Sequence, residues 1–302
     1  MTFSLDILIP HYCDPNGLAL TLGSIENQTW SGYISVVIFD DGSPFEQFEA
    51  AQVVCDRYAS GRINKLKIIR SETNVGRPRA RNTLLENSKS SYIAWLDAGD
   101  IWYPEKLTSQ FNYLYNLECR GANLNRMWVT CDYDWTQDGK TRSLKQDVSG
   151  DQYNKIVSGE SLRSYLWTLL GTAESFKIAG RFDERLPRLQ DMDYFLSFVK
   201  GGGKLVNVPG KKSLCQYFKS DVGRKSDEVR RSYEIIRRKN FPHLQKYPSH
   251  FIRMLDWKHE KLFARFAYAN RNYLSYLHHT VKAGLLRPSH TAKMIVKASV
   301  GR

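Results

Sequence analysis

The first hundred residues of the chain alternate between short apolar runs and helical patterns. The apolar runs cover residues 5–12, 34–39, 66–69 and 92–96, and each ends at proline, turn-forming or charged residues. Runs of this length between turn residues are typical of buried strands in a parallel sheet. Parallel strands need crossover helices between them, so the alternation predicts a doubly wound α/β domain.

Acidic residues directly follow two of these runs. Asp40 and Asp41 come at the end of the second run, and the segment DAGD at residues 97–100 follows the fourth. Open α/β sheets bind their ligands at the carboxyl ends of the strands. Carboxylates at that edge can hold a divalent cation against a diphosphate. The alternative is a pair of solvated turns that happen to carry charge.

The composition of the 302 residues, 42% hydrophobic and 25% charged, is that of an ordinary globular protein. No apolar run approaches the roughly 20 residues of a membrane-spanning helix. The N-terminal residues lack the basic region of a secretory signal, so a leader is not expected. Five scattered cysteines without a CxxC pair argue against a disulfide framework or a structural zinc site. We therefore expect a protein of the reducing cytoplasm.

The net charge of +13 is confined to the C-terminal part of the chain. Residues 224–302 hold 18 Lys and Arg and 5 Asp and Glu, whereas residues 1–223 hold 26 of each sign. This change in composition predicts a domain boundary after residue 223. An α/β domain would precede the boundary, and a basic helical segment would follow it.

The basic segment, residues 224–302, shows helical spacing of its apolar side chains. These are Val229, Tyr233, Ile236, Phe251, Leu255, Leu262, Phe266, Tyr268, Tyr273, Tyr276 and Leu277, with a last short helix expected through Met294 and Val296. Basic amphipathic helices are typical of elements that bind an anionic membrane surface or a partner, here at the inner face of the membrane. The alternative is that the apolar stripe packs on the preceding domain. No nucleic-acid-binding motif accompanies the charge, so nucleic acid is not an expected partner.

Five short motifs occur in an order that is typical of one family. They are IPHY at residues 9–12, FDDGS at 39–43, NVGRPRARN at 74–82, WLDAGDIWYPEKL at 95–107 and GRFDERLPRLQDMDYF at 180–195. Over residues 5–217 the chain resembles the family 2 glycosyltransferases of the GT-A fold. The resemblance implies a Rossmann-like, mostly parallel central sheet with helices on both faces, followed by a C-terminal helical extension.

The same resemblance implies an inverting glycosyltransferase. Such an enzyme moves a sugar from a nucleotide-diphosphate donor, here expected to be a UDP-sugar, to a hydroxyl of a glycan or lipid-linked acceptor. Bacterial surface polysaccharide synthesis is the setting that the family suggests. A nucleotidyltransferase would need a glycine-rich basic loop after the first strand, where this chain has PHYC at residues 10–13. A non-catalytic protein that binds a sugar nucleotide, or a scaffold, is the remaining alternative.

Candidate residues for the nucleotide base come from the first two motifs. A carboxylate at Asp41 can accept a hydrogen bond from the imide N–H of uracil, and the match to the family's Asp-Asp-Gly-Ser motif suggests that role. The resemblance implies that Pro10, His11 and Tyr12 line the base pocket. A solvated turn is the alternative for Asp41, and a structural role is the alternative for His11.

Candidate residues for the rest of the donor come from the third and fourth motifs. Guanidinium groups can fork onto phosphate oxygens, and a helix start also favours anions. The spacing of Arg77, Arg79 and Arg81 leaves at least one of them on the surface, and Arg77 and Arg81 are the candidates for the diphosphate. The resemblance adds Asp97 and Ala98 to the donor site.

The expected metal site departs from the family pattern. The last acid of the family's Asp-x-Asp motif normally contacts the ion, and Gly99 stands in its place, flanked by Asp97 and Asp100. A histidine that sometimes follows the last strand is replaced by Phe218 and its neighbours. Hard cations need oxygen ligands, so binding of Mn²⁺ or Mg²⁺ through Asp97 and Asp100 is expected to be weak.

The fifth motif contains the candidate general base. Asp191 matches the family's catalytic aspartate, while Gln190 replaces the usual glutamate. Asp191 and Asp193 cannot face the same way on a helix or a strand, so only one can reach the site. The alternative is that these acids stabilise the first turn of a helix. Gln190 and Trp102 are the candidates for the acceptor side.

Overall fold

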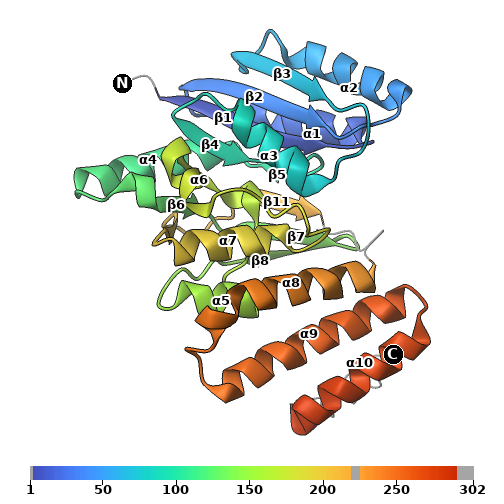
Figure 1. The fold of residues 1–302 in the computed structure, drawn as a ribbon. Helices are drawn as coiled ribbons and strands as arrows, with labels where there is room; N and C mark the ends of the chain where they lie inside the picture. Colours follow the sequence, from blue (N-terminus) through green and yellow to red (C-terminus); the bar gives the residue numbers. More distant parts are fainter. Residues whose placement is uncertain (1–2, 219–224, 291–302) are drawn as a thin grey trace. The chain divides into compact units, whose positions relative to one another are not determined.

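The computed structural model describes residues 3–218 and 225–290, which form two compact units (Figure 1). One unit comprises residues 1–184 and 191–220, and the other comprises residues 185–190 and 221–302. The boundary predicted after residue 223 falls outside the described residues. No sequence pattern predicts that the segment 185–190 groups with the C-terminal helices.

The larger unit is built on a sheet of seven strands. Their spatial order is β10 (Lys204–Asn207), β6 (Met127–Thr130), β9 (Leu170–Thr172), β4 (Tyr92–Trp95), β1 (Ser4–His11), β2 (Tyr33–Asp40) and β3 (Lys65–Arg70). β9 pairs antiparallel with β4 and β6, and the other pairs in this sheet are parallel. The sheet is therefore mostly parallel, which confirms the predicted α/β fold class.

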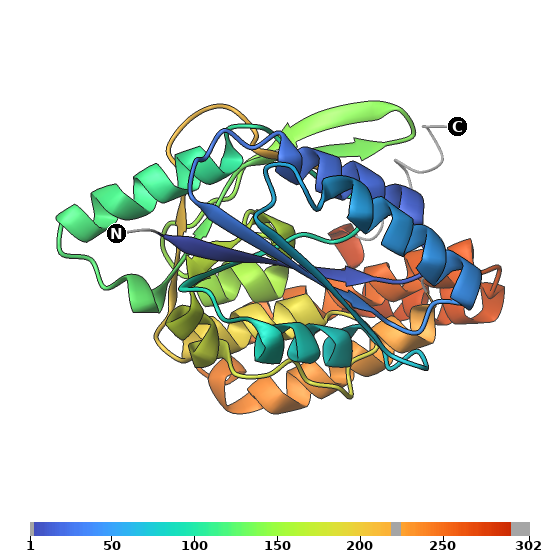
Figure 2. The ribbon, with the colours of Figure 1, turned by 90° about the horizontal axis from the view of Figure 1, so that it is seen from above.

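Helices cover both faces of this sheet. Figure 2 shows α1 and α2 on one side of β1 and β2 and α3 on the other. Because helices cover both faces, β1 and β2 consist almost wholly of buried residues. The helices of the unit are α1 (Pro15–Glu26), α2 (Phe45–Tyr58), α3 (Arg77–Asn87), α4 (Lys106–Cys119), α5 (Gln152–Ser158), α6 (Ala173–Ala179) and α7 (Gln190–Lys200), with short 3₁₀ turns at Leu124–Arg126 and Leu166–Thr168.

A second sheet of four strands completes the larger unit. Its order is β5 (Ile101–Trp102), β11 (Cys215–Phe218), β7 (Tyr133–Gln137) and β8 (Lys140–Leu144). β11 pairs antiparallel with β5 and parallel with β7. The last strand of the unit therefore lies beside the strand that directly follows the DAGD segment.

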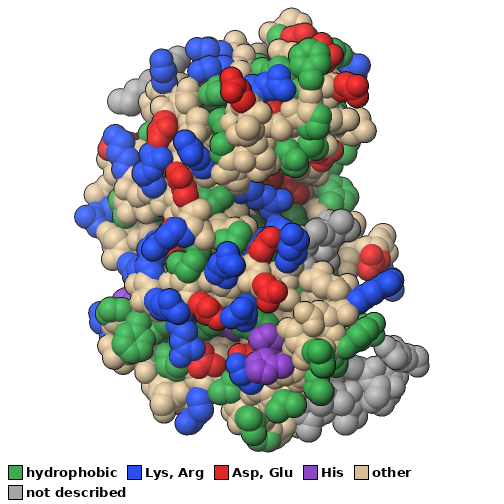
Figure 3. Space-filling model, turned by 45° about the vertical axis from the view of Figure 1, so that its right-hand side comes forward, with side chains coloured by type: hydrophobic (Ala, Val, Ile, Leu, Met, Phe, Trp, Pro, Cys, Tyr) green, Lys and Arg blue, Asp and Glu red, His purple; other side chains and the backbone are tan. Residues whose placement is uncertain are grey.

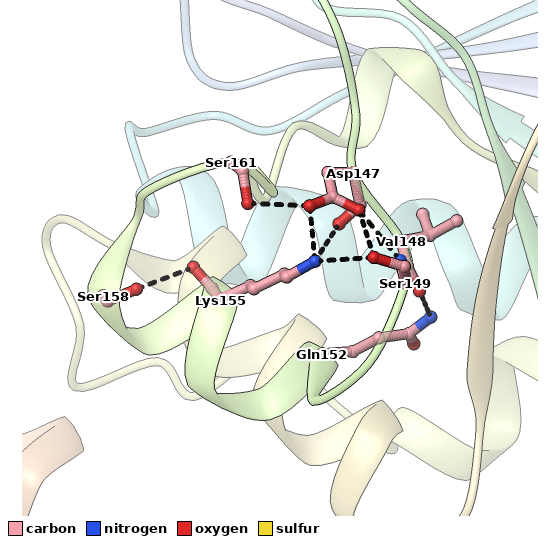
Figure 4. Close-up of polar contacts among 7 residues, drawn as sticks. All are labelled: Asp147, Val148, Ser149, Gln152, Lys155, Ser158 and Ser161. Carbon is pink, nitrogen blue, oxygen red and sulfur yellow. Dashed lines mark hydrogen bonds and ion pairs between the residues drawn. The ribbon is translucent and has the colours of Figure 1, made fainter.

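A polar cluster fixes the loop between β8 and α5 (Figure 4). The Lys155 ammonium donates to Asp147 Oδ2 at 2.5 Å and to Ser149 Oγ at 3.0 Å. The Ser161 hydroxyl donates to the same Asp147 oxygen at 3.4 Å. The side chain of Asp147 is 45% exposed, so this ion pair orders a surface loop and adds little to stability.

The smaller unit contains the helices α8 (Ser226–Leu244), α9 (Ser249–Ala269) and α10 (Tyr273–Leu286). Their inward side chains, among them Tyr233, Leu255 and Phe263, are buried. The rings of Tyr233 and His259 stack with centroids 3.4 Å apart. The helical character predicted for the basic segment is confirmed over these ranges, and the short helix expected through Met294 lies outside the described residues. No helix in residues 3–218 or 225–290 is long and apolar enough to cross a membrane.

Candidate active site

The candidate site lies at the carboxyl ends of β1, β2 and β4. These strands are parallel neighbours, so their last residues meet at one edge of the sheet. The IPHY and FDDGS motifs span the ends of β1 and β2, and the DAGD segment follows β4. Arg81 lies on α3 and Asp191 on α7. The topology therefore brings all five motifs toward one edge.

His11 joins the ends of β1 and β2. Its Nδ1 lies 2.7 Å from Oδ2 of Asp40, and its Nε2 accepts the backbone N–H of Asp14 at 3.3 Å. These partners require the proton on Nδ1. Burial raises the pKa of Asp40, but hydrogen bonds from His11 and Ser43 outweigh it and leave the pKa lowered. Both side chains are buried, so this pair fixes the strand ends. Contact of Pro10 and Tyr12 with the nucleotide base stays a prediction. The Tyr12 side chain is 52% exposed.

Asp41 holds the loop that leads into α3. Its Oδ1 accepts the backbone N–H of Val75 at 2.7 Å, and its Oδ2 accepts that of Gly76 at 3.1 Å. Burial raises the pKa of Asp41 more than these two hydrogen bonds lower it. A carboxylate oxygen can accept more than one hydrogen bond, so the expected bond from a uracil imide stays a prediction.

Arg81 joins two carboxylates that are far apart in the sequence. Its Nη2 lies 3.2 Å from both carboxylate oxygens of Asp97, and its Nη1 contacts Oδ1 of Asp191. The Arg81 side chain is 2% exposed, whereas those of Asp97 and Asp191 are 34% and 28% exposed. The two Nη atoms are thus paired with carboxylates that can be reached from outside, while the buried Nε has no hydrogen-bond partner. Binding of a phosphate by Arg81 stays a prediction.

Arg77 and Arg79 are both exposed in the first turn of α3. The positive charge of Arg77 lowers the pKa of Asp41 and of Asp191, which places Arg77 within electrostatic range of both. Arg77 is therefore the better candidate for a phosphate contact than the buried Arg81.

Asp191 lies in the first turn of α7 with its carboxylate against Arg81. Burial raises the pKa of Asp191, and the negative charge of Asp97 raises it further. The positive charges of Arg81 and Arg77 lower this pKa, but it remains above its ordinary value. A raised pKa makes a carboxylate a stronger base, which suits proton abstraction. Asp193 is 2% exposed, so Asp191 is the acid of the two that is accessible at this edge.

The DAGD turn is tied to α1 through Thr21. The Thr21 hydroxyl accepts the backbone N–H of Gly99 at 3.0 Å and donates to the carbonyl of Asp100 at 2.9 Å. Gly99 has a φ of +95°, a conformation that side chains other than glycine rarely adopt. Burial raises the pKa of Asp100 well above its usual range, and Asp97 adds to this. Ala98 is half-buried in the same turn.

The divalent cation that the family implies does not fit these side chains as they lie. Asp97 is paired with Arg81, Gly99 offers no ligand, and the buried Asp100 favours its neutral form. Residues 3–218 and 225–290 contain no group of three His, Cys, Asp or Glu side chains that could hold an ion. As they lie, Asp97 and Asp100 therefore do not form an open pair of carboxylate ligands on either side of Gly99.

Asn82 is a positioning residue that the sequence motifs do not single out. Its Nδ2 donates to the carbonyl of Phe182 and to Glu184 Oε1, both at 3.0 Å, and its Oδ1 accepts the Phe182 N–H at 2.8 Å. The Arg81 guanidinium lies over the Phe182 ring. Asn82 thus anchors the segment before α7 to the helix that carries Arg81. Its place next to Arg81 in the NVGRPRARN motif is the one available sequence signal.

Both residues that the sequence predicts for the acceptor side, Trp102 and Gln190, are buried in this structure. Trp102 is 1% exposed, and its indole N–H donates to the carbonyl of Trp167 at 2.9 Å. The Lys106 ammonium lies 3.8 Å from the centroid of the same ring. Gln190 is 5% exposed. An aromatic residue after a strand end is a weak signal, because only the tertiary structure shows which way the ring points.

A comparison with models of protein families identifies the family to which the chain belongs. The family model for glycosyl transferase family 2 matches residues 6–172, more than half of the chain. The chain belongs to glycosyltransferase family 2. The predicted resemblance is confirmed, and the chain is a transferase of this family.

Curated members of family 2 resemble the chain at modest identity. AmsB, an amylovoran biosynthesis glycosyltransferase of Erwinia amylovora, is 29% identical over 216 residues, which cover 68% of this chain and 67% of AmsB. WfgD of Escherichia coli, a UDP-Glc:alpha-D-GlcNAc-diphosphoundecaprenol beta-1,3-glucosyltransferase, is 28% identical over 112 residues, which cover 37% of this chain and 41% of WfgD.

Solved structures of similar fold include two complexes with sugar nucleotides. The S. aureus TarS 1-349 complex with UDP-GlcNAc has a TM-score of 0.62 at 15% identity, covering 96% of this chain and 83% of that one. The mannosyltransferase PcManGT from Pyrobaculum calidifontis, in complex with GDP-Man and Mn²⁺, has a TM-score of 0.59 at 14% identity, covering 98% and 79%. At these identities the likeness shows the fold alone, which agrees with the predicted GT-A architecture.

Proposed function

We propose that this family 2 member is an inverting glycosyltransferase that uses a UDP-sugar and acts in bacterial surface polysaccharide synthesis. The observation that carries the proposal is the pairing of Asp97 and Asp191 on the single guanidinium of Arg81. This arrangement places the partly exposed carboxylate of Asp191 at the ligand-binding edge of the sheet. Burial keeps the pKa of Asp191 above its ordinary value, although Arg81 lowers it. Its acceptor would be a hydroxyl of a glycan or of a lipid-linked sugar.

In the proposed reaction, Asp191 takes the proton of the acceptor hydroxyl while the hydroxyl oxygen bonds to the anomeric carbon. The bond from that carbon to the diphosphate oxygen breaks on the opposite side, and its electron pair leaves with the nucleoside diphosphate. Arg77 offsets part of the negative charge that develops on the leaving group. Arg81 acts as a positioning residue, because it orients the carboxylate of Asp191.

The donor and acceptor classes rest on what the similar proteins are named for. TarS is described with UDP-GlcNAc, and WfgD is named for transfer from UDP-Glc to a diphosphoundecaprenol-linked sugar. AmsB is named for amylovoran biosynthesis. PcManGT is described with GDP-Man, so a GDP-sugar is the competing donor class.

The test is calorimetric titration of the protein with UDP and with GDP, in the presence and absence of Mn²⁺ or Mg²⁺. We expect UDP to bind more tightly than GDP. Release of UDP from a panel of UDP-sugars would then show turnover, and NMR of the transferred sugar would show an inverted anomeric configuration. Tighter binding of GDP would overturn the donor proposal, and retention of configuration would overturn the mechanism.

A non-catalytic sugar-nucleotide-binding or scaffold protein was the alternative raised by Gly99 and Gln190. Membership of a transferase family and the placement of Asp191 favour catalysis over this alternative. Binding of UDP without release of UDP from any UDP-sugar would favour the non-catalytic alternative.

A further inference from the structure

The outward face of α10 is apolar where a surface helix is expected to be polar. Leu274, Leu277, Val281 and Leu285 follow one another at spacings of three or four residues and so lie on one face of the helix. Their exposed fractions are 84%, 59%, 53% and 78%. Their opposite face carries the buried His279 and Ala283. We call these four residues the α10 stripe.

Three tyrosines stand at the N-terminal end of the α10 stripe. Tyr268, Tyr273 and Tyr276 are 49%, 61% and 37% exposed, and the Tyr268 ring lies 6.1 Å and 5.4 Å from the other two. Tyrosine combines an apolar ring with a polar tip, and it is enriched where hydrocarbon meets water. The apolar surface is thus bordered by side chains suited to a membrane interface.

Two exposed basic side chains lie in or next to the helix that carries the α10 stripe. Lys282 within α10 and Arg271 just before it are exposed. Residues 224–302 account for the whole net charge of +13. Figure 3 shows hydrophobic side chains on the surface over the C-terminal helices beside Lys, Arg and His side chains. An apolar stripe within a basic surface is typical of helices that lie in the interface of anionic lipids.

We propose that the α10 stripe enters the headgroup region of an anionic lipid bilayer while exposed basic side chains such as Lys282 and Arg271 bind its phosphates. A second copy of the chain is a poorer occupant, because two such surfaces would each bring the same positive charge. The earlier expectation of a basic membrane-binding segment is thereby assigned to one helix face. The proposal does not rest on the proposed reaction, since lipid binding can be measured without a donor.

The test is flotation of the full chain with vesicles of phosphatidylglycerol or of phosphatidylcholine alone. We expect binding to the phosphatidylglycerol vesicles at low salt, weakening as salt rises, and little binding to phosphatidylcholine. Combining Leu274→Gln with Leu285→Gln should lower partitioning by about tenfold or more, because each leucine loses its transfer into an apolar environment. The matched control is Leu20→Gln in α1, whose leucine is also exposed at 57% and should not affect binding.

Several results would overturn the proposal. One is absence of binding to phosphatidylglycerol vesicles at low salt, and another is equal binding by the α10 double variant. A third is a lipid-free dimer, seen by sedimentation equilibrium, that the double variant dissociates; this would assign the stripe to a second copy. Circular dichroism checks the fold, and Leu277→Gln with Val281→Gln provides a second pair if the first unfolds.

Discussion

At the scale of single residues, the contacts of Arg81 decide which acid can act as a base. Asp97 and Asp191 share its guanidinium, and both remain partly exposed. Asp100, only three residues after Asp97, is buried and its pKa is raised well above the usual range. The acids of the two motifs are therefore chemically different, although they look alike in the sequence.

Replacement of Asp191 by Asn should remove the base while keeping the shape of the side chain. We expect transfer to fall by a factor of about 100 or more, with affinity for UDP nearly unchanged. The matched control is Asp147→Asn, which breaks an exposed ion pair with Lys155 and should leave transfer intact. Normal turnover by Asp191→Asn, measured as UDP release, would exclude Asp191 from the mechanism.

The pH dependence of transfer should change when the positive charge of Arg77 is removed. Asp191 is active when deprotonated, so kcat should fall as the pH drops through its pKa, which is above the ordinary value. Arg77 lowers that pKa, so Arg77→Gln should move the acid limb of the kcat profile to higher pH. Arg79→Gln, also exposed on the same helix, is the control and should leave the limb in place. Equal shifts in the two variants would contradict the assigned role of Arg77.

At the scale of elements, the turn after β4 limits what this site can bind. The turn needs glycine at position 99 for its φ of +95°, and Thr21 of α1 holds it in place. A Cβ added there would have room, since Asp14 Oδ2, at 3.7 Å, is the atom that it would meet. The obstacle to an acid at this position is thus backbone conformation and not space.

Replacement of Gly99 by Asp should therefore have two separable effects. A side chain at this left-handed backbone position should lower the free energy of unfolding by about 1–2 kcal/mol, measured by denaturant titration. The added oxygen ligand should tighten Mn²⁺ binding in the presence of UDP, measured by calorimetry. Gly99→Ala is the matched control, with the backbone cost and no ligand. If Gly99→Asp binds Mn²⁺ no better than Gly99→Ala, the turn does not hold an ion in the family manner.

At the scale of the whole molecule, the short segment 185–190 groups with the C-terminal helices although it leads directly into Asp191. The Arg188 N–H donates to Ser232 Oγ at 3.1 Å, and its Nε donates to Glu228 Oε2 at 3.1 Å. The helices therefore hold the chain just before the candidate base. Their expected role is therefore wider than the proposed lipid binding.

Removal of residues 224–302 should lower transfer to a soluble acceptor even though Asp191, Asp97 and Arg81 remain. Loss of the contacts of Arg188 lets the segment before Asp191 move, and a small misplacement of a catalytic group can cost up to about 100-fold. Glu228→Gln is the milder companion variant, because it removes one partner of Arg188 and keeps the helices. A truncated protein with full activity on a soluble acceptor would show that the helices serve only as a docking surface.

The alternation of strands and helices and the fold class could be predicted from sequence because they depend on local patterns. Buried strands read as continuous apolar runs, and the turns after them carry glycine and acids for conformational reasons. The replacement of a family acid by Gly99 was also visible, and its effect on metal binding stays a prediction. The burial of Trp102 was not visible, because the direction of a ring depends on partners such as Trp167, 65 residues away.

The sequence by itself determined the alternation of strands and helices, the family, and the concentration of positive charge after residue 223. Hydrophobic periodicity and charge are local properties that a chain carries before it folds. Only the tertiary structure decided that Arg81 lies between Asp97 and Asp191, the latter 110 residues away. Only the tertiary structure separated the buried apolar residues of the C-terminal helices from the exposed stripe of α10. Both outcomes depend on which surfaces meet when distant segments pack, and sequence spacing alone does not specify that.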